Sequence, residues 1–280
     1  MESKSPVIKW SGSKRSQASE IVSFFPPFKT FYDPFVGGGS ILASASFKKA
    51  IAGDICEPLI RFWQLLQNKP KQLIESYKEN WNLLQSEGYM HYYKVRDRFN
   101  KEKNPCDLLF LSRTCVNGLI RFNRDGKFNN SLHYTRPGIN PDSLSTIIQE
   151  WALKVKNVEF LIGDYKSTTK GITEQDFVYL DPPYFNTNGR YYGRIDFQDF
   201  LDYLEFLNSI SVKYVLSFDG TRGDFEYTKD IPRSLYKHHI LLASGNSTFR
   251  KVIDKKVEKV QESVYLNFEL KRKQGLAFFS

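Results

Sequence analysis

A short motif in the second half of the chain has unusual hydrogen-bonding capacity. Asp181-Pro182-Pro183-Tyr184 directly follows the apolar run 177–180, which predicts a buried strand. The two prolines stiffen the turn and leave the Asp181 carboxylate and the Pro182 carbonyl as two acceptors at the strand's carboxyl end. A planar amine with two N–H groups satisfies both acceptors, and the Tyr184 ring offers it a flat face. The motif therefore favours binding of an exocyclic amine on a heterocycle such as adenine over a purely structural loop.

A glycine-rich segment in the N-terminal part of the chain predicts a second binding feature. Residues 33–40 read Asp-Pro-Phe-Val-Gly-Gly-Gly-Ser, and Ser40 is the predicted N-cap of a short helix. The glycines let backbone N–H groups approach a ligand closely, although such runs are also common in structural turns. Asp54, after the next apolar run, can accept hydrogen bonds from ribose hydroxyls. The spacing matches neither the dinucleotide-binding fingerprint nor a phosphate-binding loop.

Both motifs require a sheet whose strands end side by side, and the order of strand and helix patterns predicts a doubly wound α/β sheet. Strands are expected at 30–36, 50–53, 158–162, 177–180 and 214–218, with an antiparallel pair at 236–243 and 263–268. Helices are expected at 41–47, 58–67, 72–87, 89–101, 106–115 and 197–209. We therefore expect a Rossmann-like catalytic domain formed by 1–60 and 157–280. A mostly helical insert, 61–156, carries a β-hairpin at Asp125-Gly126.

The predicted insert also holds most of the excess positive charge. The 280-residue chain has 40 Lys and Arg against 31 Asp and Glu, a net charge of +9. Residues 91–136 contain ten basic and four acidic side chains. A charge surplus is often only a solvated face, but its concentration around a hairpin favours a nucleic-acid partner.

The composition excludes several classes of protein. With 41% hydrophobic and 15% aromatic residues, the chain has enough apolar side chains for a core and is not mostly disordered. No apolar run approaches a membrane span and no signal-like stretch opens the chain, so we expect no membrane partner. The 3 cysteines and 4 histidines lack metal-ligand spacing, so we expect reduced thiols in a cytoplasmic protein and no metal.

Taken in order, these motifs resemble those of the Dam-type DNA adenine methyltransferases of the alpha group. The resemblance spans nearly the whole chain and rests on residues 9–14, 33–40, 53–54, 117–123, 126–129 and 181–184. Residues 89–129 are most similar to the adenine methylase of the EcoRV restriction system. The resemblance implies transfer of a methyl group from S-adenosylmethionine to the 6-amino group of an adenine flipped out of double-stranded DNA.

The resemblance also implies roles for individual residues. The expected catalytic residues are Asp181, Pro182 and Tyr184. The expected cofactor-binding residues are Trp10, Lys14, Phe35, Gly37, Gly39, Asp54, Asp164 and Asp181. The expected DNA contacts are Lys9, Asn117, Arg121, Asn123, Arg124, Lys127 and Arg136. Lys9 matches a family lysine that reads a guanine, so we expect a target site with guanine directly 5′ of the methylated adenine. Asp125 departs from the family pattern, which has an arginine there.

Two alternatives remain open at this point. The Asp-Pro-Pro-Tyr motif also suits cytosine amines and RNA bases, so methylation of either is a rival activity. A DNA-binding relative that has lost catalysis is the other, although an intact Asp181 to Tyr184 argues against it.

We expect a monomer, because one flipped base needs one active site. A restriction endonuclease that acts on the same site is a candidate partner besides DNA.

Overall fold

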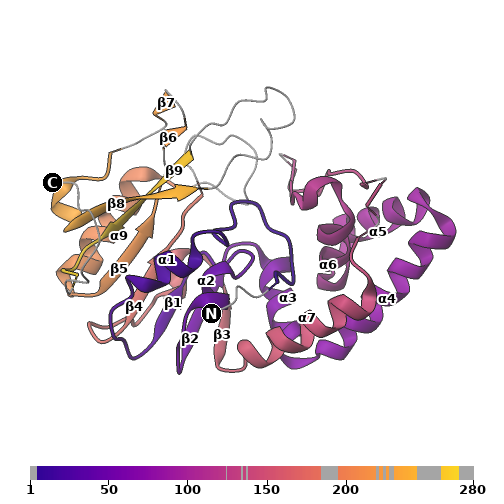
Figure 1. Ribbon diagram of the computed structural model, residues 1–280, viewed down its shortest axis with the longest axis horizontal. Coiled ribbons are helices and arrows are strands. Elements are labelled where there is room, and N and C mark those ends of the chain that lie inside the picture. Colours follow the sequence, from indigo (N-terminus) through magenta and orange to yellow (C-terminus); the bar gives the residue numbers. More distant parts are fainter. Residues whose placement is uncertain are drawn as a thin grey trace.

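The computed structural model describes residues 5–123, 125–133, 135–136, 138–183, 195–218, 221–222, 225–226, 230–244 and 260–270 (Figure 1). Parallel strands run in the order β3 (Val158–Ile162), β2 (Ala50–Asp54), β1 (Phe31–Asp33), β4 (Phe177–Leu180) and β5 (Lys213–Ser217). β9 (Val260–Leu266) lies antiparallel between β5 and β8 (His238–Ser244). β9 also pairs with the two-residue strand β6 (Thr221–Arg222), which in turn pairs with β7 (Phe225–Glu226). This order confirms the predicted α/β sheet and its late antiparallel pair.

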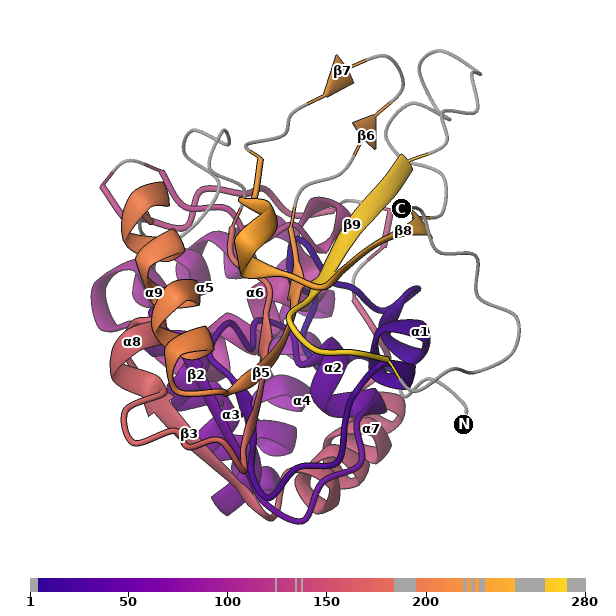
Figure 2. The same cartoon turned by 90° about the vertical axis from the view of Figure 1, so that its left-hand side faces the viewer.

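Alternate side chains of the strands enter two hydrophobic cores on opposite faces of the sheet. On β4, Phe177 and Tyr179 join one core, and Val178 and Leu180 join the other. The first core is covered by α1 (Ala18–Ser23), α2 (Ser40–Ser44) and α3 (Glu57–Asn68). The second is covered by α8 (Tyr165–Thr168) and α9 (Phe197–Ser209), which Figure 2 shows on the side opposite to α1 and α2. Burial on both faces explains why β4 has an unbroken apolar sequence.

A block of helices lies beside the sheet (Figure 1). It contains α4 (Pro70–Glu87), α5 (Tyr89–Glu102), α6 (Pro105–Thr114) and α7 (Pro141–Lys154). The side chains of Asn104 and Asn140 cap α6 and α7, and each cap is followed by a proline that fits the first turn. None of the helices in the described ranges combines the length and apolar composition needed to cross a bilayer.

This block does not have a core of its own. Leu73 of α4, Val95 of α5 and Leu108 of α6 belong to the same hydrophobic cluster as the α3 side of the sheet. The boundary predicted near position 60 lies inside α3, which packs on β3 as well as on α6 and α7. The limits 61–156 of the insert therefore stay a prediction.

The expected hairpin is a compact turn rather than a pair of regular strands. Phe122 and Phe128 form an isolated bridge, and both rings contact Phe99 of α5. The Asn123 Oδ1 atom accepts hydrogen bonds from the N–H groups of Asp125, at 3.0 Å, and Lys127, at 2.9 Å. The Asp-Gly signal located the turn correctly, but packing on α5 takes the place of an extended ladder.

The start of α2 differs from the expectation. The N-cap is Gly39, with φ +73°, and Ser40 is the first helical residue. The Ser40 hydroxyl lies 2.7 Å from the Ser13 hydroxyl instead of capping the helix. The helix also ends at Ser44, three positions before the predicted end at Phe47.

Candidate active site and DNA interface

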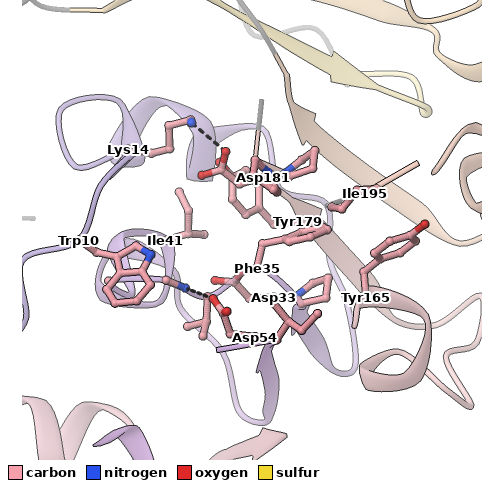
Figure 3. A pocket seen from close by; sticks show the side chains of 18 of the residues that line it. Trp10, Lys14, Asp33, Phe35, Ile41, Asp54, Tyr165, Tyr179, Asp181 and Ile195 are labelled. Carbon is pink, nitrogen blue, oxygen red and sulfur yellow. Dashed lines mark hydrogen bonds and ion pairs between the residues drawn. The ribbon is translucent and has the colours of Figure 1, made fainter. Parts of the chain in front are cut away.

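The strand order brings the two sequence motifs together. β1 and β4 are neighbours, but the chain continues from β1 toward β2 and from β4 toward β5. Their carboxyl ends therefore form a topological switch point, where open α/β sheets bind ligands. The turn 34–38 and the loop 181–183 line one cavity of about 300 Å³ at this point (Figure 3).

Two tryptophans shape the glycine turn. Gly37 has φ +46°, and a Cβ atom there would lie 2.9 Å from Trp10 Cδ1. Trp63 Nε1 donates to the Gly37 carbonyl at 3.0 Å. A Cβ atom on Gly39 would lie 2.9 Å from the Trp63 ring, away from the cavity lining that includes Gly37 and Trp10. The Cβ side of Gly39 therefore faces the Trp63 ring, and the cofactor contact expected of Gly39 stays a prediction.

Asp54 fastens the glycine turn to the sheet. Its Oδ2 atom accepts from the Gly37 N–H at 3.2 Å, and its Oδ1 atom accepts from the Cys56 N–H at 2.9 Å. Burial raises the pKa of Asp54 to about 6, and the hydrogen bonds from backbone N–H groups oppose this shift. Each oxygen has a second lone pair, so the carboxylate can still accept from a ligand hydroxyl. Ile55, 48% exposed, lines the cavity next to it, and sequence reasoning missed this residue.

Asp164 and Phe35 also line this cavity, on the side of α8. The Asp164 carboxylate accepts from the Ser167 N–H at 2.7 Å, so it caps α8 as well as lining the cavity. Phe35 stacks on Tyr165 with ring centroids 5.7 Å apart. The Tyr165 hydroxyl donates to Asp199 at 2.8 Å. Tyr165 and Asp199 lie on separate helices without a shared motif, and so no sequence signal pointed to them.

Asp181 lies at the other end of the cavity, in an ion-pair network. The Lys14 ammonium is 2.7 Å from Asp181 Oδ1 and 2.7 Å from Glu262 Oε1. Burial raises the pKa of Asp181 to about 6, the Lys14 charge lowers it, and the Glu262 charge raises it. Pro182 lines the cavity beside Asp181. Tyr184, the expected stacking residue, lies outside the described residues.

Asp33, the last residue of β1, is a further acid at the cavity. Its side chain is 2% exposed, and its Oδ1 atom has no hydrogen-bond partner among the described residues. Burial, with the nearby charge of Asp181, raises its pKa well above the usual range. A buried acceptor without a partner is costly, so a donor or cation that enters the cavity would be stabilised there.

Lys9 lies where the N-terminal segment meets the helical block. Its side chain covers Gly118, which has φ +63°, and a Cβ atom on Gly118 would come within 2.1 Å of Lys9 Cδ. Burial lowers the pKa of Lys9, and the charges of Arg113 and Arg136 lower it further. Lys9 and Arg136 therefore belong to one electropositive region, which also includes the exposed Asn117 next to Gly118.

The remaining predicted DNA contacts lie on the turn that follows α6. Arg121 and Lys127 are exposed, and Arg121 Nε donates to the side chain of Asn129 at 3.0 Å. The carbonyl oxygen of the Asn123 side chain is occupied within the turn, so this residue shapes the turn. Arg124 lies outside the described residues.

One N-terminal segment, 5–14, runs from the helical block to the cavity. Side chains of the helical block hold its start, because Trp151 donates to the Ser5 carbonyl at 2.9 Å and Arg113 donates to the Val7 carbonyl at 3.0 Å. The same segment carries Lys9, Trp10 and Lys14.

The chain matches known proteins over most of its length. The family model described as D12 class N6 adenine-specific DNA methyltransferase matches residues 10–245. The Type II methyltransferase M.MjaIII of Methanocaldococcus jannaschii is 36% identical over 221 residues, which cover 69% of this chain and 75% of that protein. The DNA adenine methylase of Escherichia coli K12 is 28% identical over 182 residues, 63% of this chain and 64% of that protein. The DNA N-6-adenine-methyltransferase of Escherichia phage P1 is 30% identical over 187 residues, 64% of this chain and 24% of that protein.

The family match includes the cavity residues from Trp10 to Asp199 and the whole helical block, but it ends before β9. It covers the cavity that holds the carboxylates of Asp54 and Asp181, and it also covers Arg136 of the electropositive region. The chain belongs to the D12 class of N6 adenine-specific DNA methyltransferases.

Proposed function

We propose that the protein transfers a methyl group from S-adenosylmethionine to the 6-amino group of adenine in double-stranded DNA, with the target base flipped out. One observation carries the proposal: Asp54 and Asp181 lie at opposite ends of the same cavity (Figure 3). The Asp54 end suits a nucleoside, and the Asp181 end suits an amine. A methyl group held between the two ends would face the amine directly.

The residues of the cavity fit S-adenosylmethionine. The unpartnered Oδ1 atom of Asp33 suits the ammonium group of the methionine part, and Asp54 suits the ribose hydroxyls. Ile55 and Phe35 offer apolar surface for the adenine ring, and Asp164 offers an acceptor for its amine. When bound, the cofactor supplies an electrophilic methyl group on a sulfonium.

Asp181 and the Pro182 carbonyl activate the target amine. The lone pair of an aromatic amine is delocalised into the ring, which makes the nitrogen a poor nucleophile. Hydrogen bonds from both N–H groups to these acceptors favour a tetrahedral nitrogen and free the lone pair. The protein's further contribution to the rate is to hold the amine in line with the methyl group. The amine of a paired adenine lies inside the duplex, and flipping it out costs about a few kcal/mol.

We assign recognition of the DNA sequence to the helical block, 61–156, together with Lys9. A lysine can donate to the O6 and N7 atoms of guanine, which supports a site with guanine directly 5′ of the target adenine. Exposed Arg121, Lys127 and Arg136 are suited to phosphates. The similarity of residues 89–129 to the EcoRV methylase remains our prediction.

We also propose that a restriction endonuclease acts on the same site in the cytoplasm of the host cell. M.MjaIII and M1.LlaDCHI of Lactococcus lactis subsp. cremoris both carry the name Type II methyltransferase, which supports this partner. A single cavity holds both ends of the proposed reaction within one chain, which supports a monomer.

The test is to identify the methylated base. The purified protein is incubated with methyl-labelled S-adenosylmethionine and either duplex DNA or RNA of the same sequence, and the nucleosides are separated by mass. We expect label in N6-methyldeoxyadenosine from duplex DNA. Label in N4-methylcytosine or in RNA would support the rival activities, and DNA binding without label would support a relative that has lost catalysis.

A further inference from the structure

Glu262 is a buried acid that the proposed reaction has not used. It lies on β9, after the end of the family match at residue 245. Within β9, Val264 and Leu266 belong to the core that α1 covers. Glu262 lies two positions before Val264 and therefore on the same side of the strand. This register directs Glu262 toward the N-terminal segment, where its Oε1 atom is 2.7 Å from the Lys14 ammonium.

The two carboxylates around Lys14 are bound differently. Asp181 shares a hydrogen bond with the ammonium, which is 2.7 Å from its Oδ1 atom. Glu262 Oε1 is equally close, but among the described residues it accepts no aligned hydrogen bond. A buried carboxylate oxygen without a hydrogen bond is unfavourable. A small rotation of the Lys14 side chain would supply one.

The target amine and the Lys14 ammonium interact with the same carboxylate. Under the proposed function, Asp181 accepts a hydrogen bond from the adenine amine, and an ammonium aimed at the same carboxylate competes with that amine. Moving a lysine away from a buried carboxylate costs free energy unless another acceptor receives it. Glu262 is that acceptor, at a distance that needs no movement of the backbone.

We propose that Glu262 is a positioning residue that receives the Lys14 ammonium when the target adenine enters, which frees Asp181 to bind the amine. This inference rests on the role proposed for Asp181. It adds a function for β9, which brings its acid to the catalytic end from outside the matched family region.

The charges that face Asp181 allow a readout through pH. Lys14 lowers the pKa of Asp181 and Glu262 raises it, while Asp33 and Tyr179 also interact electrostatically with Asp181. Glu262→Gln removes a negative charge, so the pKa of Asp181 should fall. The acid limb of the kcat profile reports ionisation of Asp181, and it should therefore move to lower pH in this variant.

The experiment compares Glu262→Gln with Glu269→Gln, the same change seven positions later, where the glutamate is 77% exposed and pairs with His238. Methylation of a duplex is measured from pH 5 to 8 with saturating DNA and cofactor. We expect Glu262→Gln to lower kcat about tenfold at pH 7.5 and to shift the acid limb downward by at least about half a pH unit. The dissociation constant for the cofactor should change less than about threefold. Glu269→Gln should match the wild type in all three.

Glu262→Asp retains the charge and should keep the acid limb of the wild type, which also provides a test if the glutamine variant unfolds. Two outcomes would overturn the positioning role. One is an unshifted acid limb in Glu262→Gln. The other is an equal loss of kcat in Glu262→Gln and Glu262→Asp, with a lowered melting temperature in both. A wild-type enzyme that does not methylate adenine would instead contradict the proposed function.

Discussion

Asp54 and Asp181 lie at opposite ends of one cavity, and burial raises the pKa of each to about 6. They differ in what stabilises their charge. Asp54 accepts hydrogen bonds from the backbone N–H groups of Gly37 and Cys56, whereas Asp181 pairs with the side chain of Lys14. Backbone donors cannot leave without rebuilding the turn, but a lysine side chain can rotate to another acceptor.

This difference separates two kinds of site. The Asp54 end is arranged before the ligand binds, which favours affinity, because little ordering remains to be done on binding. Under the proposed function, the Asp181 end changes partners when the target amine enters, so we expect substitutions there to act on the rate. Substitutions at the two ends should therefore affect different measured quantities.

The largest effect is expected at the catalytic end. Asp181→Ala removes one of the two amine acceptors and should lower kcat by roughly 10²–10³, the loss typical of a preorganised hydrogen-bonding group. Binding to duplex DNA should stay within about threefold, because Asp181 lies in the cavity and not on the turn that carries Arg121. Single-turnover methylation measures the rate. The control is Asp199→Ala, which changes another acid of the cavity, and equal rates in the two variants would contradict the assignment.

At the cofactor end the expected loss is in affinity. Asp54→Ala removes a charged acceptor and should weaken S-adenosylmethionine binding by about 1–3 kcal/mol, measured by calorimetric titration. kcat at saturating cofactor should change much less than in Asp181→Ala. Asp164→Ala provides the comparison, since it removes the acceptor proposed for the adenine amine instead of the ribose. Unchanged affinity in Asp54→Ala would place the ribose elsewhere.

The pKa of Asp54 predicts how affinity depends on pH. The carboxylate is ionised above about pH 6 and takes up a proton as the pH falls below that value, which weakens its acceptor strength. Cofactor affinity should therefore fall about tenfold between pH 7 and pH 5, following the protonated fraction of one group. Asp54→Asn should flatten this dependence. An equally steep profile in the asparagine variant would assign the titration to another group.

The smallest effect is expected where Lys9 covers Gly118, and it tests whether that region is as rigid as the Asp54 end. Gly118→Ala and Gly126→Ala both place a Cβ at positive φ, +63° and +69°, but only the first meets Lys9. Each substitution should lower the free energy of unfolding by about 1 kcal/mol or more, because alanine is strained at positive φ. Only Gly118→Ala should raise the KM for DNA, by roughly threefold to tenfold beyond the Gly126→Ala value. Equal KM values would show that Lys9 adjusts freely.

Several elements could be predicted because their signals are local. The apolar run 177–180 and the helix 197–209 have the predicted limits in the structure. α7 was not predicted, although Asn140 and Pro141 form an ordinary helix start and Leu144, Ile148 and Trp151 have helical spacing. Sequence spacing could not show that the Trp63 ring lies against Gly39.

The sequence by itself determined the chemistry that each motif can perform. Asp181-Pro182 offers two acceptors wherever it lies, and the glycines at 37–39 permit a turn with positive φ, because both properties follow from covalent structure. Only the tertiary structure decided which charges meet. Lys14, Asp181 and Glu262 lie far apart in the chain and come from a loop, the end of a parallel strand and an antiparallel strand. Their distances depend on strand order and register, which are fixed by packing of the two cores and not by any local pattern.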